Sequence, residues 1–390
     1  MTPAARVQAA IEVLDLVIEA ARSNGAPADR LIADWFRPRR FAGSGDRRAV
    51  RELAYRAIRL CGEIPENGRA AMLQVAAQDE QVAALFDGSR HAPEPIEAGE
   101  PVAQAGIAPR WLMERLAASG VAETEAAALL DRAPLDIRVN TLRAGRLSLP
   151  EGAERTVAAN GWRYPPETRI EQSDAYKSGA IEVQDTGSQL TCEAVAAAPG
   201  EAVIDLCAGA GGKTLALAAA MENTGALIAC DTDRPRLSRL APRAERAGAS
   251  CIETVLLNPG REMEALERFA GKADAVLVDA PCSGTGTWRR NPEARWRLTE
   301  RQLARYVETQ ARLLDIAAGL VRPGGRLVFV TCSLLDEEGA SQAEGFLARH
   351  ADWQAQAPTL AAGTPRGAGL RLSPHCDGTD GFFVARFALL

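Results

Sequence analysis

The sequence contains little lysine or histidine and no clustered cysteine. Its 390 residues include three histidines and eight cysteines, and its lysines are Lys177, Lys213 and Lys272. The cysteines are scattered along the chain without a CxxC pair, which argues against a disulfide framework and against a zinc site. We therefore expect a protein that binds no metal.

Long apolar runs are also missing. None reaches the roughly 20 residues that a membrane-spanning helix needs, and Glu12 and Asp15 interrupt the apolar positions where a signal peptide would need an unbroken run. We expect a cytoplasmic protein with no membrane partner, and we expect a monomer. The net charge of −6 argues weakly against binding nucleic acid over the whole surface, although local basic patches can still bind it.

Residues 1–90 have the pattern of a helical domain. Apolar residues recur at helical spacing over 7–21, 28–36 and 46–61. The stretch 37–51 is rich in arginine and is either a solvated loop or a phosphate-binding patch. The candidate contacts in this patch are Arg37, Arg39, Arg40, Arg47 and Arg48.

The rest of the chain divides into three segments. Residues 91–101 are Pro-rich and acidic and predict a linker. Residues 102–185 combine helices with short strands and predict a small α/β lead-in domain. Over 186–390 strands and helices alternate, which is typical of a doubly wound, mostly parallel, Rossmann-like sheet. We predict its strands at 202–206, 226–230, 252–257, 274–279 and 325–331, with a last pair near 368–372 and 381–387.

A strand ending in Asp205 leads into a glycine-rich turn and a helix. A phosphate-binding P-loop is excluded because Cys207 stands where a glycine is required. A dinucleotide site would need a glycine near Thr214, which is absent. The third interpretation is an S-adenosylmethionine site. Asp231, at the end of the next strand, stands where a nucleoside-binding sheet places its ribose acceptor.

Two cysteines follow directly after strands. Asp279 ends an apolar run and Cys282 comes three residues later, whereas Cys332 ends a second such run. Neighbouring strands lie about 4.8 Å apart, so the carboxylate and both thiols would share one crevice. Buried cysteines are usually inert, but a thiolate in a pocket that lowers its pKa is a nucleophile. The pattern therefore indicates covalent chemistry on an electrophilic ring, with inert packing as the alternative.

Several motifs resemble, in order and spacing, the RNA cytosine-C5 methyltransferases of the RsmB/Sun type. They are DLCAGAGGKT from residue 205, DAPCSGTG from 279 followed by RRNPEARW, VTCSLLDEEG from 330, DGTDGFFVARF from 377, IRVNTLR from 137 and VQDTGSQ from 183. The resemblance covers about 102–390. The helical N-terminus looks, more loosely, like the NusB-like RNA-binding domain of that family. The implied fold is a Rossmann-like S-adenosylmethionine-dependent methyltransferase with an N-terminal helical domain.

The resemblance also implies a mechanism, in which RNA, with 16S rRNA as the first candidate, is the partner. Cys332 would attack C6 of a flipped-out cytosine, Asp279 would hydrogen-bond the N3 side of the ring, and Cys282 would assist release of the product. The implied contacts to the cofactor S-adenosylmethionine are Cys207, Ala208, Gly209, Ala210, Gly211, Gly212, Lys213, Asp231, Asn258 and Asp279.

The sequence departs from the family at three places. The family usually has Ala-Pro where Gly209-Ala210 stands, an adenine-contacting aspartate where Asn258 stands, and an asparagine where Gly339 stands. Two alternative functions are a tRNA cytosine-C5 methyltransferase and a noncatalytic RNA-binding or assembly factor that retains the fold. The intact thiols and carboxylate argue against the second alternative.

An arginine cluster follows the DAPCSGTG motif. Its members Arg289, Arg290, Arg295 and Arg297 lie among Trp288 and Trp296. They are either a packed helix start or a set of contacts to the phosphates that flank the flipped cytosine. We predict RNA contacts at Arg289 and Arg290.

Overall fold

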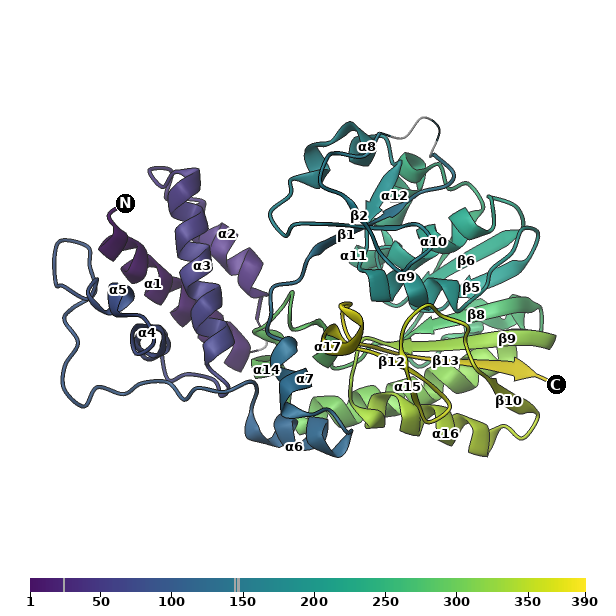
Figure 1. Ribbon diagram of the computed structural model, residues 1–390. Coiled ribbons are helices and arrows are strands. Elements are labelled where there is room, and N and C mark those ends of the chain that lie inside the picture. The colour runs from purple at the N-terminus through teal and green to yellow at the C-terminus, as the bar shows by residue number, and fades with distance from the viewer. Residues whose placement is uncertain (24, 144, 146–147) are drawn as a thin grey trace. The chain divides into compact units, whose positions relative to one another are not determined.

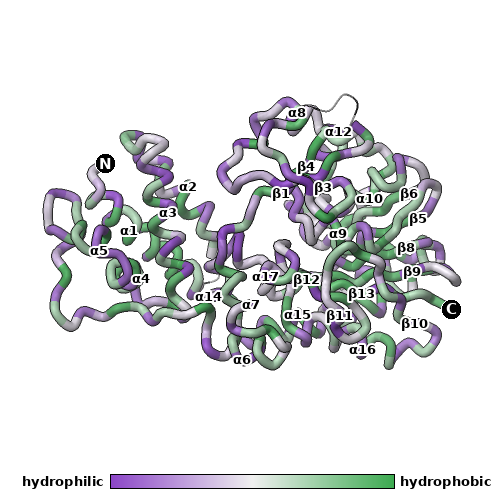
Figure 2. The backbone as a smooth tube through the Cα atoms, in the orientation of Figure 1, coloured by the Kyte–Doolittle hydropathy of each residue, from purple (hydrophilic) through white to green (hydrophobic). Residues whose placement is uncertain are grey.

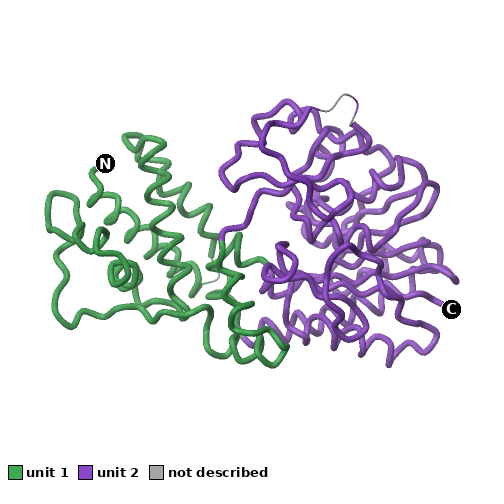
Figure 3. Tube along the Cα trace, in the orientation of Figure 1, with its two compact units in different colours: residues 1–131, 287–299 green, residues 132–286, 300–390 purple. Residues whose placement is uncertain are grey.

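The computed structural model describes residues 1–23, 25–143, 145 and 148–390 (Figure 1). The chain forms two compact units, which Figure 3 colours separately. Unit 1 consists of Met1–Asp131 and Thr287–Thr299, and unit 2 consists of Arg132–Gly286 and Glu300–Leu390. In the ranges that the structure describes, no helix is both long and apolar enough to span a membrane.

Unit 1 is a set of helices around one apolar core. The helices are α1 (Pro3–Arg22), α2 (Ala28–Phe36), α3 (Ser44–Leu60), α4 (Gly68–Ala76), α5 (Glu80–Ala83), α6 (Arg110–Ala118), α7 (Glu123–Ala128) and α14 (Ala294–Arg297). Leu14 of α1 belongs to the same buried cluster as Val50 and Ile58 of α3. A side chain at Gly68 would collide with the Ile11 carbonyl oxygen, 2.2 Å from the Cβ position. Glycine therefore lets α4 pack closely against α1.

Segment 287–299 is attached to the C-terminal end of α3. The buried guanidinium of Arg295 donates to the backbone oxygens of Ile58 and Cys61, at 2.5 and 2.9 Å. The indole nitrogen of Trp296 donates to the Cys61 oxygen at 3.1 Å. These donors satisfy carbonyl groups that have no partner within the helix. Arg297 donates to two further backbone oxygens, both at 2.6 Å. The packed-helix interpretation therefore holds for Arg295 and Trp296, and the phosphate contact predicted for Arg295 is wrong because its guanidinium is fully buried. The Arg297 side chain is bonded to backbone oxygens of the same unit.

Unit 2 contains a nine-stranded sheet. Its strands are β5 (Ala202–Asp205), β6 (Ala226–Asp231), β7 (Ile252–Leu256), β8 (Ala273–Asp279), β9 (Val321–Thr331), β10 (Trp353–Gln356), β11 (Thr364–Arg366), β12 (Gly369–Leu372) and β13 (Phe382–Leu389). The order is β11-β12-β13-β9-β8-β5-β6-β7, with β10 paired to β13. The five neighbouring strands β9, β8, β5, β6 and β7 run parallel to one another, whereas β13 is antiparallel to β9. The chain passes from β5 to β6 on one side and returns to β8 on the other, which makes their carboxyl ends a ligand-binding switch point.

Both faces of this sheet are covered. Successive residues of a strand point to opposite faces, so Ile204 and Val276 face a core shared with α15 and α16, whereas Val203 and Leu277 face α9 and α10. The central strands are accordingly largely green in Figure 2. The helices of unit 2 are α8 (Asp174–Lys177), α9 (Thr186–Glu193), α10 (Gly212–Ala220), α11 (Arg234–Leu237), α12 (Leu240–Ala247), α13 (Met263–Leu266), α15 (Glu300–Leu320), α16 (Ala340–Arg349) and α17 (Pro374–Asp377).

The predicted fold class, a doubly wound α/β sheet with an N-terminal helical domain, is confirmed. The seven strands predicted over 186–390 are all present, with ends shifted by a few residues. β9 begins at Val321 rather than at 325. The sequence does not predict β10 and β11, because they are short, largely exposed strands that owe their conformation to pairing with β13 and β12.

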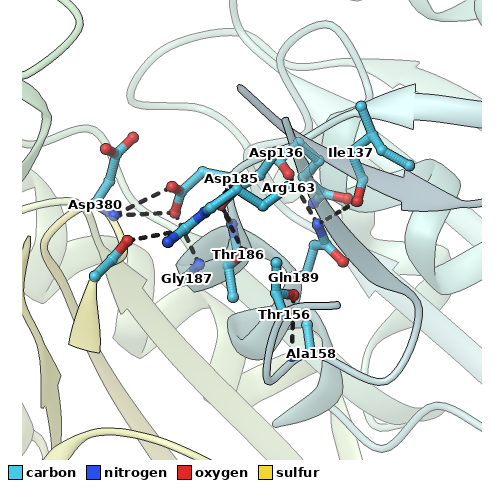
Figure 4. A network of polar contacts seen from close by, with 12 residues as sticks. Asp136, Ile137, Thr156, Ala158, Arg163, Asp185, Thr186, Gly187, Gln189 and Asp380 are labelled. Atoms are coloured by element: carbon cyan, nitrogen blue, oxygen red, sulfur yellow. Dashed lines mark hydrogen bonds and ion pairs between the residues drawn. The ribbon is translucent and has the colours of Figure 1, made fainter. Parts of the chain in front are cut away.

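A second, four-stranded sheet in unit 2 joins the large one through a polar network. Its strands are β1 (Leu135–Val139), β2 (Glu154–Arg155), β3 (Gly161–Tyr164) and β4 (Ile181–Val183), in the order β2-β3-β1-β4. The buried carboxylate of Asp136 accepts from Arg163 Nε at 2.7 Å and from Thr186 Oγ1, at the start of α9, at 2.6 Å. Arg163 also donates to the Gly378 oxygen at 2.8 Å (Figure 4). The lead-in sheet is therefore held to α9 and to the segment before β13.

Candidate active site

A glycine turn joins β5 to α10. Gly209 and Gly211 have φ of +56° and +86°, a left-handed conformation that favours glycine. A Cβ on Gly211 would lie 2.1 Å from Leu240 Cδ1, so glycine also permits close packing of α12. By contrast, a Cβ on Gly212 would meet no heavy atom within 4 Å. The backbone at the start of α10 is therefore open to a ligand.

Asp231 at the end of β6 holds this turn in place. Its carboxylate accepts from the backbone nitrogens of Gly209 and Asp233, each at 2.7 Å. Asp231 is paired with Leu256 in β7, so the exposed Asn258 follows at the same edge of the sheet. The carboxylate predicted to bind a ribose thus also shapes the glycine turn.

Asp205 at the end of β5 has one oxygen without a partner. Its Oδ2 accepts from Thr214 Oγ1 at 2.7 Å, whereas Oδ1 is buried and has no hydrogen-bond partner among the described residues. Burial raises the pKa of Asp205 to about 7. An unpaired buried acceptor is costly, and a ligand amine beside the glycine turn would supply the missing donor. These residues fit the methionine end of S-adenosylmethionine.

The two strand-end cysteines meet at the switch point. The Sγ atoms of Cys282 and Cys332 lie 3.3 Å apart. The loops that carry them start side by side, because Asp279 of β8 is in register with Val330 of β9. The hydrogen bond to Cys332, together with burial, raises the pKa of Cys282 well above its usual range. Either sulfur can be the donor in this contact, and the raised pKa of Cys282 favours Cys282 as the donor.

A buried glutamate braces the two loops. Glu338 accepts from the backbone nitrogen of Ser283 at 2.8 Å and also from the Ser283 hydroxyl. Gln310 of α15 donates to Glu338 at 3.1 Å and to the Pro281 oxygen at 3.0 Å. Burial raises the pKa of Glu338, although the serine hydrogen bonds oppose this shift. Cys282, between Pro281 and Ser283, is thus held from both sides.

Hydroxyl groups add a second set of contacts between the same loops. Ser333 Oγ lies 3.2 Å from Ser283 Oγ and 3.0 Å from Thr285 Oγ1. The backbone nitrogen of Gly286 donates to the Cys332 oxygen at 3.0 Å. These hydroxyls and the bracing glutamate are not among the residues that the sequence predicts. The only sign of these contacts in the sequence is that a serine follows each of the two cysteines.

The segment before β13 packs closely behind the thiol loops. Gly381 donates to the Gly286 oxygen at 2.8 Å, and a Cβ on Gly286 would lie 2.1 Å from the Gly381 oxygen. A Cβ on Gly339 would lie 2.8 Å from Phe383 Cγ. The glycine that replaces the family's asparagine at 339 is therefore matched to the Phe383 ring.

Lys213 connects the glycine turn with the thiol loops. Its Nζ lies 2.7 Å from Asp279 Oδ2 and 5.4 Å from the centre of the Phe382 ring. Burial lowers the pKa of Lys213, but the Asp279 carboxylate outweighs this effect and the net shift is upward. The lysine predicted as a cofactor contact therefore orients Asp279.

The arginine patch of unit 1 is only partly bonded. Three members have partners within the unit: Arg37, Arg39 and Arg47. Arg40 and Arg48 are exposed, and their side chains make no hydrogen bond or ion pair with any described residue. Phe41 beside them is 73 % exposed. After the thiol loop, Arg289 is buried and Arg290 is half-buried, so Arg290 is the more accessible of the two.

Several known proteins are similar to this chain in sequence and in fold. A family model described as 16S rRNA methyltransferase RsmB/F matches residues 193–388. The chain is 34 % identical over 297 residues to a probable ribosomal RNA small subunit methyltransferase B of Synechocystis sp., covering 71 % of this chain and 66 % of that protein. It is 36 % identical over 294 residues to the ribosomal RNA small subunit methyltransferase B of Xylella fastidiosa, covering 71 % and 68 %.

The match therefore spans just under two thirds of the Synechocystis protein. Among solved structures, the crystal structure of PH0851 has 25 % sequence identity and a TM-score of 0.77, and the similarity covers 99 % of both chains. Within the described residues, no group of three or more His, Cys, Asp or Glu side chains is arranged to hold a metal ion.

The thiol pair predicts a specific reactivity. A trivalent arsenical such as phenylarsine oxide bonds two adjacent thiols at once, so one molecule should bind tightly across Cys282 and Cys332. Cys282→Ser and Cys332→Ser should each abolish tight binding, whereas Cys376→Ser, at an exposed thiol, should not. Mass spectrometry of the native protein measures the stoichiometry. Tight binding that survives both replacements would contradict the geometry.

Proposed function

Because the chain belongs to the 16S rRNA methyltransferase RsmB/F family, we propose that it transfers a methyl group from S-adenosylmethionine to C5 of a cytosine in RNA. Ribosomal 16S RNA is the first candidate substrate. The observation that carries the proposal is the pair of thiols 3.3 Å apart, on the loops that follow Asp279 of β8 and Thr331 of β9. Methylation of an amine or a hydroxyl needs no sulfur nucleophile. By contrast, C5 of cytosine becomes nucleophilic once a nucleophile has added to C6.

The Cys332 sulfur is the proposed nucleophile. In the resting pair, Cys282 donates its proton toward this sulfur and so stabilises negative charge on it. The sulfur bonds to C6, the C5–C6 double bond opens, and its electron pair makes C5 nucleophilic. Asp279, oriented by Lys213, hydrogen-bonds the N3 side of the ring and stabilises the charge that develops there. The cytosine must leave its stack to reach these groups.

Cys282 acts in the second half of the reaction. When Cys332 is bonded to carbon, the hydrogen bond that most strongly raises the pKa of Cys282 is lost. Cys282 can then release its own proton to solvent and take the proton from C5. The C5–H electrons re-form the double bond, and the bond between C6 and the Cys332 sulfur breaks. The product leaves, Cys282 holds the proton from C5, and Cys332 is released as the thiolate with which the cycle began.

The cofactor supplies an electrophilic methyl group. On the protein side, the turn 207–213 would bind its methionine end, with the Asp205 Oδ1 accepting from the amine. Asp231 would accept from the ribose hydroxyls, and Asn258 would contact the adenine. The open backbone at Gly212 and the unpaired Asp205 oxygen support this assignment.

RNA would be held by groups outside the thiol pocket. In unit 1, Arg40 and Arg48 offer unpaired positive charge, and the exposed Phe41 ring offers a surface for stacking a base. In the segment after the thiol loop, Arg289 and Arg290 are the proposed contacts. A folded loop of RNA with splayed bases is the kind of substrate that such separated contacts suit.

The two cysteines should respond differently to replacement. Cys332→Ala should reduce methyl transfer to background and form no adduct, because the nucleophile is lost. Cys282→Ala should accumulate a protein–RNA complex that survives denaturation, because attack proceeds and release does not. Denaturing electrophoresis with labelled RNA and unlabelled cofactor makes the measurement.

A trapped complex in Cys332→Ala instead of Cys282→Ala would reverse the two roles. Absence of methyl transfer by the intact chain would favour a noncatalytic RNA-binding factor. If the methyl group were transferred to tRNA but not to 16S rRNA, the proposed reaction would stand and the proposed substrate would be wrong.

The arginine patch makes a separate prediction. The double replacement Arg40→Glu and Arg48→Glu should weaken RNA binding and lower the slope of log affinity against log salt by about one for each lost phosphate contact. Cofactor affinity, measured by calorimetry, should not change. The matched control is Arg90→Glu, at another exposed and unpaired arginine of unit 1. If the wild type and the double variant bound RNA with equal affinity, the arginine patch would not contact the RNA and this proposal would be wrong.

A further inference from the structure

Two buried polar groups of unit 2 lack partners and line the same groove. Arg138 of β1 is 5 % exposed, its Nε donates to Gln184 at 2.8 Å, and its Nη2 has no partner among the described residues. Gln189 of α9 is 2 % exposed, and its Oε1 likewise has none. Its amide nitrogen donates to the Ile137 and Gln184 oxygens at 3.1 and 2.8 Å, which fixes which end is the acceptor (Figure 4).

Among the described residues, Arg138 also forms no ion pair. Its cross-strand neighbour in β4 is Glu182, but this carboxylate already pairs with Arg243 at 2.9 Å and with Arg246. Arg138 forms no ion pair with any residue that the structure describes. Each buried donor or acceptor left unpaired costs free energy. A pair of them in one groove therefore requires an explanation.

The groove has the size and the lining of a ligand site. Its volume is 550 Å³, and its lining includes Arg138, Gln189, Asn160, Ala216, Ala219 and Ala220. The alanines form an apolar wall along α10, beside the polar groups. Ala219 is seven residues beyond Gly212, about 10 Å along the helix axis from the glycine turn. The groove therefore lies along α10 beyond the glycine turn, and its lining does not include the residues of the thiol pocket.

We propose that this groove binds an unstacked nucleobase of the RNA substrate, at a position flanking the target cytosine. A nucleobase has apolar faces and, on one edge, an acceptor next to a donor. Arg138 can donate to that acceptor, Gln189 can accept from that donor, and the alanine wall can cover one face. A phosphate would satisfy the arginine but would leave the glutamine oxygen unpaired. The proposal rests on the proposed function, because it assumes an RNA substrate.

The test compares binding to four single-stranded RNA oligomers, each made of a single base, by fluorescence anisotropy. The wild-type chain should prefer one base. Arg138→Gln should weaken binding of the preferred oligomer about tenfold, the effect of a lost hydrogen bond to a charged group, and should reduce the preference. Ala220→Gln, a neutral replacement at the exposed rim that leaves both polar groups in place, should do the same by filling the groove.

The control is Ala348→Gln, because Ala348 is an exposed alanine in the last turn of α16 as Ala220 is in α10. It should behave as wild type, and all variants should keep wild-type cofactor affinity, which shows that they fold. Equal weakening of all four oligomers by Arg138→Gln, with a lower salt slope, would mean a phosphate contact and would overturn the proposal. So would an Ala220→Gln variant indistinguishable from wild type, or a wild type without base preference.

Methyl transfer to RNA by the wild-type chain is measured in parallel. If it occurs while the groove variants bind as wild type, this inference fails and the proposed function stands. If it does not occur with any RNA, the proposed function fails first.

Discussion

The hydrogen bonds that Glu338 accepts from the Ser283 loop are the interaction on which the site depends. The loops that carry the two thiols come from different strands, and parallel pairing of β8 and β9 sets only where they begin. Glu338 and its partner Gln310 fix the path of the first loop against the second. The carboxyl group is fully buried, so removing one of its partners would leave a buried acceptor without a donor. The tight glycine contacts behind the loops leave little room for another arrangement.

The remainder of the site is joined to this brace by one ion pair. Lys213 belongs to the glycine turn and Asp279 to the thiol loop, and their contact at 2.7 Å connects the proposed cofactor half with the proposed substrate half. The chain then leaves the loop at Gly286 and enters segment 287–299. This segment is attached to α3 through Arg295. The thiol loop is therefore continuous in sequence with a segment that packs within helical unit 1.

The sequence predicts what depends on local pattern. The parallel strands are runs of apolar residues, so their positions and the residues at their ends, such as Asp279 and Cys332, can be read directly. Contacts between segments far apart in the chain cannot be read in this way. Glu338 looks like one of several loop carboxylates until its distance from Ser283 is known. Arg295 looks like a phosphate contact until its carbonyl partners on α3, more than two hundred residues earlier, are seen. Arg138 is equally ordinary until the structure shows it buried without an ion pair among the described residues.

The central claim is that Cys332, and not its neighbour 3.3 Å away, forms the bond to the cytosine ring. Fluorine at C5 of the target cytosine cannot be removed as a proton is, so the adduct persists after methyl transfer. The full chain would be incubated with S-adenosylmethionine and RNA carrying 5-fluorocytosine, digested, and mapped by mass spectrometry. The account predicts a nucleotide attached to the peptide that contains Cys332. Attachment to the peptide that contains Cys282, or no adduct from an enzyme that methylates ordinary RNA, would contradict it.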